Sequence, residues 1–414
     1  MAGHTMITGR RRTADGRPRH VAARRPLLSA LLFALVAGLV GFCLTPAPSA
    51  VAATGTLLRD GTGLYPRAVR LEHSGDANGR IIASVVTFAN GDGLGAIYES
   101  TDDGGSFQQV GTVADPEAAD DKGLCCATLY ELPQQVGDLP AGTLLWAASV
   151  GQGVGDPLMS IRVFKSTDVG RTWSYLSTVA AAGNERGLWE PEFSVDAEGN
   201  LVCHYSDETD GVHSQKLVAA RSSDGVTWTG HHDTIASALD SDRPGMAVVR
   251  KLPNGTYFMT YEICAAAGQY VCVVHYRTSP DGWDWGDPTY LGIRPETADG
   301  KYFKHAPTVA WGPEEGNPQG RLFLVGQVMY NADGSEADGS KRTIWTNSAG
   351  GEGAWQEVSA PVGVDSTTID YCPNYSSALL PSADGTRVLE IATDYDGTVC
   401  KPYFATGDVT TVRG

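Results

Sequence analysis

The chain has 414 residues and a formal net charge of −17 at pH 7, since 48 aspartates and glutamates outweigh 31 lysines and arginines. So acidic a composition argues against nucleic acid or another anionic polymer as a partner, because like charges repel. A chain of this length would ordinarily divide into two domains, but repeated segments run to both ends of residues 54–414 and leave no linker.

Residues 1–53 have the composition of a secretory signal peptide. Seven arginines precede an apolar run over residues 27–44, and small residues follow at 49–53. Such a segment is removed on export, so we expect residues 54–414 to form a single secreted, extracellular domain. Removal of seven arginines and one aspartate leaves 24 basic and 47 acidic residues, a net charge of −23.

Six times in the remaining chain a short apolar run follows a glycine-centred turn. The runs are rich in β-branched and aromatic residues and are bounded by Gly, Asn, Asp and Pro, which is the pattern of strands and hairpins. Self-similarity at a fixed period indicates one unit copied around an axis, because a single unit cannot bury its own apolar face. The turn glycines are Gly79, Gly142, Gly199, Gly255, Gly320 and Gly385.

A second repeat falls later in each unit. Ser100–Phe107 and Ser166–Trp173 fit the pattern Ser-x-Asp-x-Gly-x-x-aromatic, Ser222–Trp228 and Thr278–Trp285 are compressed versions, and Thr346–Trp355 is a degenerate one. These segments resemble Asp-box hairpins, in which the carboxylate accepts bonds from turn N–H groups, and we interpret them as structural. Two repeats per unit predict an all-β fold, a six-bladed β-propeller of four-stranded antiparallel blades with Asp-box hairpins.

Seven cysteines follow the signal segment. Export permits disulfides, and we expect the pairs Cys264–Cys272 and Cys372–Cys400, each of which lies within one blade. The odd count leaves at least one thiol unpaired, or a bridge between the adjacent Cys125 and Cys126. No Cys and His spacing resembles a zinc site, and we expect no metal and no cofactor.

The phase of the repeats selects residues for a functional rim. The innermost strand of a blade starts at one rim of the channel and turns at the other, so residues well before the repeat glycines share the rim opposite the first turns. A concave rim with converging polar groups is the default binding site. The residues singled out there are Arg67, Trp189, Glu190, Arg243, Glu262, His305, Asn374 and Tyr375.

Two carboxylates stand out on this rim. Glu190 follows Trp189 and precedes Pro191, and Glu262 follows Tyr261 at the end of a predicted strand. Desolvation beside aromatic surface raises the pKa of a carboxyl and suits it to proton transfer near neutrality. Paired carboxylates near aromatic platforms are the parts of glycoside hydrolysis. From the residues alone, a hydrogen-bonded strut is an equal alternative for each glutamate.

The stretch from Trp189 to Trp285 resembles the exo-1,5-α-L-arabinanases of glycoside hydrolase family 93. The resemblance implies a sialidase-like six-bladed propeller that cleaves α-1,5-L-arabinan from its non-reducing end, with retention, and releases arabinobiose. It implies that Glu190 and Glu262 are catalytic, and we expect Glu190 to be the nucleophile and Glu262 the acid/base. The motifs that carry it are Leu188–Pro191, Cys203–Asp210, His213–Val218, Arg243–Met246, Lys251–Gly255 and Met259–Glu262.

Two departures from the family pattern adjoin the expected active centre. Glu192 stands where an apolar residue is expected, and Cys264 and Cys272 replace a Gly-rich loop beside Glu262. Both put the subsite preference in question.

We expect the other rim residues to bind substrate, but for each of them a purely structural role is also possible. Arg67 and Arg243 either bond sugar hydroxyls or pair with rim acids such as Asp242 or Glu192. Trp189 and Tyr375 either stack on a furanose ring or pack the channel wall. His305 either touches sugar, orients a carboxylate or fills the core.

Two other functional classes stay open. A sialidase would hold a substrate carboxylate with three arginines and use a tyrosine nucleophile, for which Tyr375 is the candidate, although no third arginine accompanies Arg67 and Arg243. A non-catalytic carbohydrate-binding propeller would carry rim aromatics without a matched carboxyl pair. We expect arabinan polysaccharide as the partner, no nucleic acid, no membrane after signal removal, and a monomer.

Overall fold

A computed structural model of the chain describes residues 55–153, 158–265 and 271–409. The chain divides into two units, Met1–Ser49 and Ala50–Gly414, and the described residues all belong to the second. The predicted signal peptide, residues 1–53, lies outside the described residues. Within the described ranges, no helix has the length and apolarity needed to cross a membrane.

The first three sheets follow the chain in order. The first holds β2 (Leu64–Arg70), β3 (Ile81–Ala89), β4 (Asp92–Ser100) and β5 (Gln108–Ala114). The second holds β6 (Leu124–Glu131), β7 (Leu144–Val150), β8 (Ser160–Ser166) and β9 (Ser174–Ala181). The third holds β10 (Leu188–Val195), β11 (Leu201–Asp207), β12 (Lys216–Ser222) and β13 (Thr229–Ile235). Two short 3-10 helices interrupt them, η1 (Gly75–Ala77) and η2 (Pro116–Ala118).

The last three sheets are less regular. The fourth holds β14 (Asp242–Lys251), β15 (Tyr257–Ala265), β16 (Val271–Ser279), β17 (Tyr302–Lys304) and β20 (Val328–Tyr330). The fifth holds β18 (Thr308–Glu314), β19 (Asn317–Val325), β21 (Thr343–Asn347) and β22 (Gln356–Ser359). The sixth holds β23 (Ala378–Pro381), β24 (Arg387–Asp396), β25 (Val399–Asp408) and β1 (Thr56–Leu57).

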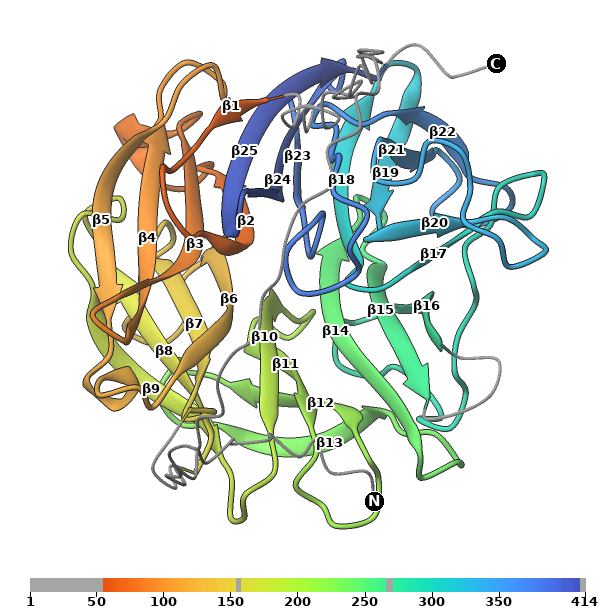
Figure 1. The fold of residues 1–414 in the computed structure, drawn as a ribbon. Helices are drawn as coiled ribbons and strands as arrows, with labels where there is room; N and C mark the ends of the chain where they lie inside the picture. The colour runs from red at the N-terminus through yellow and green to blue at the C-terminus, as the bar shows by residue number, and fades with distance from the viewer. Residues whose placement is uncertain (1–54, 154–157, 266–270, 410–414) are drawn as a thin grey trace, which may run out of the picture. The chain divides into compact units, whose positions relative to one another are not determined.

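The six antiparallel sheets stand around a common centre, as the blades of a propeller (Figure 1). Their innermost strands are β2, β6, β10, β14, β18 and β23. A cavity of about 410 Å³ lies on the axis, and all six innermost strands line it, with Arg70, Glu131, Glu192, Arg250, Trp311 and Pro381 among the lining residues. The predicted six-bladed propeller is confirmed.

Two blades differ from the simple repeat. The fourth has five strands, because β17 and β20 add a short pair beyond β16. The sixth takes its outermost strand from the start of the chain, where Thr56 pairs with Phe404 and Leu57 with Tyr403. This pairing of β1 with β25 closes the ring, because the first and last segments then share one sheet.

Five of the six predicted glycines lie in the turn between the first and second strands of their blades, with φ from 70° at Gly385 to 90° at Gly79. The prediction for Gly320 is wrong in detail, because this residue lies inside β19. The turn of the fifth blade contains Gly316 instead, with φ of 77°. The register shift between Gly312 and Glu314 displaces the hairpin.

Both predicted disulfides, Cys264–Cys272 and Cys372–Cys400, are present. The adjacent Cys125 and Cys126 are also bridged. Among the described residues, Cys203 is the remaining free thiol, and it is buried. The bridge between adjacent cysteines and the unpaired thiol therefore occur together.

The Asp boxes form self-contained turns. In the second blade, Oδ1 of Asp168 accepts hydrogen bonds from Ser166 Oγ at 2.8 Å and from the N–H of Thr172 at 2.9 Å, and Oδ2 accepts from Thr172 Oγ1 at 2.6 Å. In the degenerate fifth box, Asn347 Oδ1 takes the place of the carboxylate and accepts from the N–H groups of Ala349 and Gly351. These bonds satisfy turn donors, which is a structural role.

The turn contacts predict a stability effect. Replacing Asp168 with Ala removes a carboxylate that accepts several hydrogen bonds, and should lower the free energy of unfolding by about 1–2 kcal/mol. Urea denaturation of the two proteins measures the difference. Asp138, an exposed residue in another turn, provides the matched control, and an equal loss in Asp138→Ala would contradict the structural role of the box.

Candidate active site

A residue in the left-handed conformation lies near the start of each innermost strand, within the first five residues of the strand in four blades and two residues before it in the other two. In the first four blades this residue stands at a β-bulge, where the register of the first strand pair shifts. Non-glycine residues in this conformation cost of order 1–3 kcal/mol each and persist only where their surroundings hold them. The six residues, which we call the left-handed ring, are Tyr65, Cys126, Glu190, Met246, Ala306 and Ser376, with φ between 46° and 60°.

The strand registers place the left-handed ring at the end of the channel away from the Asp boxes. In the third blade, Trp189 pairs with Ser206 near the start of β10, whereas Ser222 of the Asp box pairs with Leu201 beside the first turn. In the fourth blade, Gly245 pairs with Glu262. Glu190 and Glu262 therefore belong to the same end, which we call the mouth.

Glu190 is a member of the left-handed ring. It lies in the third blade and forms hydrogen bonds with residues of the second and fourth blades. Its N–H donates to Ser149 Oγ at 3.1 Å, and its Oε2 accepts from Ser206 Oγ at 2.7 Å and from the N–H of Met246 at 3.0 Å. Burial raises the pKa of the Glu190 carboxyl, while the two hydrogen bonds and the nearby Arg243 oppose the rise.

Glu262 occupies a repeated position in the second strand of its blade. Counted from the start of β7, β11 and β15, the sixth residue is Ser149, Ser206 and Glu262 respectively. Oε2 of Glu262 accepts a hydrogen bond of 2.7 Å from the N–H of Ala306 in the next blade. Burial raises the pKa of Glu262 to about 8, the Ala306 N–H opposes this rise, and the charge of Glu190 adds to it.

The two carboxyls differ in how well their anions are stabilised. Glu190 accepts two hydrogen bonds and Glu262 accepts one from a proton-bearing donor. Since each donor favours the charged form, Glu190 is the better site for the negative charge and Glu262 for the proton. Because their charges interact, the two groups titrate as a coupled pair.

Aromatic and apolar side chains surround the carboxyls. Tyr65, Met246 and Ala306 form a buried cluster on which Tyr375 packs, and the rings of Tyr65 and Tyr375 are 6.3 Å apart. The Tyr375 hydroxyl donates to Met246 Sδ at 3.5 Å. Burial raises the pKa of Tyr375, and the charges of Glu262 and Glu190 raise it further, so this phenol stands beside both carboxyls in its neutral form.

The two rim arginines are held by protein acceptors. Arg67 is buried, stacks over the ring of Tyr65 at 4.3 Å and donates to Ser376 Oγ at 3.0 Å. Arg243 is partly exposed, pairs with Glu208 and donates to Gln215 Oε1 at 2.6 Å. The acid that pairs with Arg243 is thus Glu208, and the expected alternatives, Asp242 and Glu192, are wrong.

Glu192 lies in the axial cavity and not in the mouth. Its Oε1 accepts from Arg250 at 2.6 Å and its Oε2 from Thr128 Oγ1 at 2.9 Å. A buried charge is tolerated where it is paired and hydrogen-bonded, and this pair satisfies the carboxylate that stands where an apolar residue was expected.

The remaining predicted residues, His305, Asn374 and Trp189, stand at or just before the starts of innermost strands. Burial lowers the pKa of His305 to about 4, so its imidazole is neutral at neutral pH. Asn374 is buried, and its amide donates to the carbonyls of Gly326 and Gln327 at 3.1 Å each, which commits both its N–H groups to the backbone. Trp189 is half-buried and packs against the core between the second and third blades.

The sequence analysis placed several further residues on the rim or in the family motifs without giving them a role. Glu208 holds Arg243, Ser206 and Met246 hold Glu190, and Tyr65 packs beside Tyr375. Ser206 could have been assigned a role from the sequence, because it occupies the same position in β11 as Glu262 does in β15. The partner of Arg243 carries no such signal, because the contact joins separate blades.

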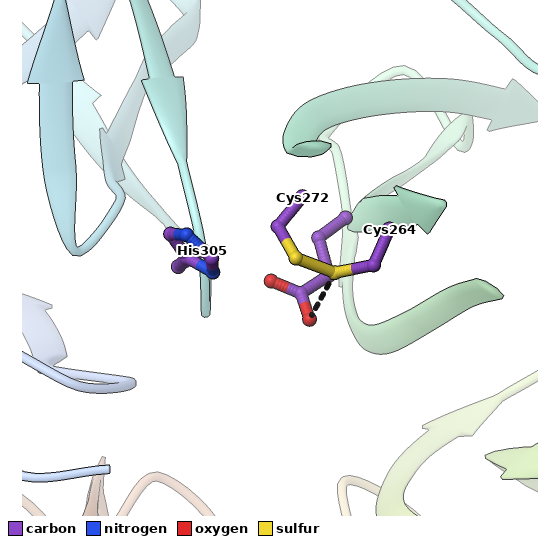
Figure 2. A group of neighbouring side chains, drawn as sticks. Cys264, Cys272 and His305 are labelled. Atoms are coloured by element: carbon purple, nitrogen blue, oxygen red, sulfur yellow. Dashed lines mark hydrogen bonds between the residues drawn. A yellow bond between two sulfur atoms is a disulfide. The ribbon is translucent and has the colours of Figure 1, made fainter. Parts of the chain in front are cut away.

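One group of side chains resembles a metal cluster. Ligand atoms of Glu262, Cys264, Cys272 and His305 lie within 4.8 Å of one another (Figure 2). The two sulfur atoms are bonded to each other, and a metal-binding cysteine must be a thiolate. While the bridge is intact, this group therefore lacks two of its four possible ligands.

The raised pKa of Glu262 predicts a pH-dependent effect on stability. The folded protein holds this proton up to about pH 8, whereas an unfolded glutamate loses it near 4.5. Between these pH values the glutamate ionises in the unfolded protein but not in the folded one. The free energy of unfolding therefore falls as the pH rises through this interval. The Glu262→Gln variant should gain stability relative to the unchanged protein over this interval, and the gain should level off above it. Urea denaturation at several pH values measures it, and a difference that does not vary with pH would contradict the shift.

No protein-family model and no curated protein sequence matches the chain. Solved structures do match it. The α-L-arabinanase of Penicillium chrysogenum, complexed with arabinobiose, has a TM-score of 0.72 and 26% identity over 87% of this chain and 99% of that chain. The GH93 α-L-arabinofuranosidase of Fusarium graminearum, also with arabinobiose, has a TM-score of 0.69 and 25% identity over 87% and 98% of the two chains.

The NanB sialidase of Streptococcus pneumoniae has a TM-score of 0.55 and 11% identity over 87% of this chain and 71% of that one, so this likeness shows the fold alone. Over most of its length, the chain is similar to glycoside hydrolases of family 93, which confirms both the predicted resemblance and the predicted enzyme class.

Proposed function

We propose that the protein is a secreted, exo-acting glycoside hydrolase that cleaves α-1,5-L-arabinan from the non-reducing end and releases arabinobiose with retention of configuration. The observation that carries the proposal is the pair Glu190 and Glu262, held on adjacent blades at one mouth. Its substrate is proposed from the arabinobiose bound in both similar structures.

In the first half of the proposed reaction, Glu190 attacks the anomeric carbon and Glu262 protonates the leaving oxygen. This step needs an ionised carboxylate and a protonated carboxyl at once. The hydrogen bonds from Ser206 and Met246 favour the anion of Glu190, and the pKa of about 8 keeps the proton on Glu262. The glycosidic bond breaks as the bond between Glu190 and the sugar forms.

In the second half, Glu262 is ionised and takes a proton from water, whose oxygen displaces Glu190 from the anomeric carbon. The charge of Glu190 disappears when it is esterified, which removes the repulsion that the Glu262 anion would otherwise feel. Glu262 can therefore act as an acid in one step and as a base in the next.

The wall of the mouth supplies the proposed sugar contacts. Tyr375 and Trp189 present partly exposed rings for a furanose, and Arg243 and His305 present polar edges. Arg67 and Asn374 act from behind this surface, because both are buried and bonded to the protein. An arginine triad for a sialic acid carboxylate is a poorer fit, since Arg67 and Arg243 already have protein acceptors.

Export is proposed from the signal-like composition of residues 1–53 and from the disulfides. The described residues contain three bridges, and disulfides persist in oxidising compartments. In that setting a polysaccharide such as arabinan is accessible to the enzyme.

Incubation of the purified protein with linear 1,5-α-L-arabinan tests the proposal. We expect arabinobiose as the first and main product throughout the digestion, because an exo enzyme removes units from one end. Chromatography with arabino-oligosaccharide standards identifies it. Parallel incubation with a sialyl conjugate should release nothing, and release of sialic acid in place of arabinobiose would overturn the proposal.

Azide rescue tests the roles of the two carboxyls. With an aryl arabinobioside, Glu190→Ala and Glu262→Ala should each lower kcat by at least about 10²-fold. Azide should restore turnover in both variants, with an inverted glycosyl azide from Glu190→Ala and a retained one from Glu262→Ala. Product NMR assigns the configuration. Glu192→Gln, which alters a glutamate of the axial cavity, is the control and should retain turnover. A retained azide from Glu190→Ala and an inverted one from Glu262→Ala would reverse the assigned roles.

A further inference from the structure

The disulfide Cys264–Cys272 lies against one carboxyl of the mouth. The Sγ of Cys264 is 3.4 Å from Oε1 of Glu262 (Figure 2). A bridged sulfur carries no proton, so this contact is not a hydrogen bond donated to the carboxylate. It instead covers the oxygen with an apolar, polarisable group, which limits the approach of water.

The other half of the bridge, Cys272, is linked to Oε2 of Glu262 through the backbone of His305 and Ala306. The carbonyl of Cys272 accepts a hydrogen bond of 2.8 Å from the N–H of His305, and the next N–H, of Ala306, donates to Oε2 of Glu262. Glu262 and Cys264 are close neighbours on β15. The contacts therefore form a closed circuit from Glu262 through the disulfide to His305 and Ala306, and back to Glu262.

This circuit holds strained backbone in place. His305 and Ala306 have φ of 63° and 46°, two successive non-glycine residues in the left-handed region. Such a conformation persists where neighbouring contacts hold it. The Cys272 carbonyl is one of those contacts, and it continues the pairing of Val273 in β16 with Lys304 in β17. The sheet pairing therefore supports the backbone that presents the Ala306 N–H to Glu262.

The surroundings of Glu190 give the contrast. Its Oε2 accepts a hydrogen bond from the Ser206 hydroxyl, which stabilises the anion, whereas Oε1 of Glu262 meets a sulfur atom without a proton. The other charged or titratable groups near Glu262 are Glu190, Arg243, His305 and Tyr375. None of these four is part of the bridge, so a change in the bridge alone leaves all of them in the protein.

We propose that the Cys264–Cys272 disulfide is a positioning element for the proton donor, because its sulfur covers Oε1 of Glu262 and keeps hydroxyl groups and water away from this oxygen. The proposal rests on the proposed function, in which Glu262 is the acid/base. Opening the bridge places hydroxyl, thiol or water donors beside Oε1. The carboxylate is then better stabilised, and Glu262 loses its proton at lower pH.

The test is a titration of Glu262 that needs no substrate. In protein labelled with ¹³C at the glutamate carboxyls, the signal that Glu262→Gln removes is followed against pH. We expect the midpoint to fall by about one pH unit or more in the double variant C264S/C272S. The control C372S/C400S also loses one disulfide, and should keep the midpoint while losing thermal stability.

A second measurement covers the case in which the double variant does not fold. A dithiol reductant transfers two electrons and two protons to the bridge of the unchanged protein and is itself oxidised to a disulfide. The control variant C372S/C400S, treated in the same way, retains Cys264–Cys272 as a target, and near-UV circular dichroism verifies that both proteins stay folded. The midpoint should fall in both upon reduction.

The activity readout separates this proposal from the proposed function. With arabinan, opening the bridge should move the alkaline limb of kcat/KM to lower pH by the same amount as the midpoint, because kcat/KM reports ionisations of the free enzyme. An unchanged midpoint in folded, bridge-free protein overturns the positioning role, whatever the substrate is. A lowered midpoint in a protein that does not release arabinobiose supports the positioning of Glu262 and overturns the proposed function alone.

Discussion

The left-handed residue at the start of each innermost strand is the constraint on which the mouth depends. In a regular ladder, a backbone N–H points along the sheet to the next strand. A left-handed residue at a bulge turns one N–H out of the ladder, and a buried N–H must find another acceptor. At Glu190, Met246 and Ala306 the acceptor comes from a side chain of the preceding blade.

This demand for acceptors explains where the carboxyls stand. A hydroxyl is sufficient at Ser149, whereas Glu190 and Glu262 bring a carboxyl to the same kind of contact. The cluster of Tyr65, Met246 and Tyr375 is apolar, and burial of the Glu262 carboxyl raises its pKa. The sequence presents a strut and a catalyst as alternatives, and the structure shows that the strut and the proposed catalyst can be one group. Oε2 accepts a hydrogen bond from the backbone of the next blade, and burial shifts the pKa of the same carboxyl.

Local features of the fold were predictable because neighbouring residues produce them. A glycine in a hairpin turn, an aspartate that satisfies N–H groups three and four residues ahead, and cysteines within one blade all act over short stretches of chain. Hence the six blades, the Asp boxes and the pairs Cys264–Cys272 and Cys372–Cys400 were predictable. The displaced turn at Gly316 was not, because it depends on a register shift between two strands.

By itself, the sequence determined the repeat, the phase that assigns Glu190 and Glu262 to the same rim, and the resemblance to family 93. The phase is sufficient for that assignment because the position of a residue along its strand decides at which end of the channel the residue lies. The tertiary structure alone decided which partner each side chain meets across blades: Glu208 for Arg243, the backbone for Asn374, and the Ala306 N–H for Glu262. Such contacts join residues far apart in the chain, and they exist only once the ring is closed and each blade is placed against the next.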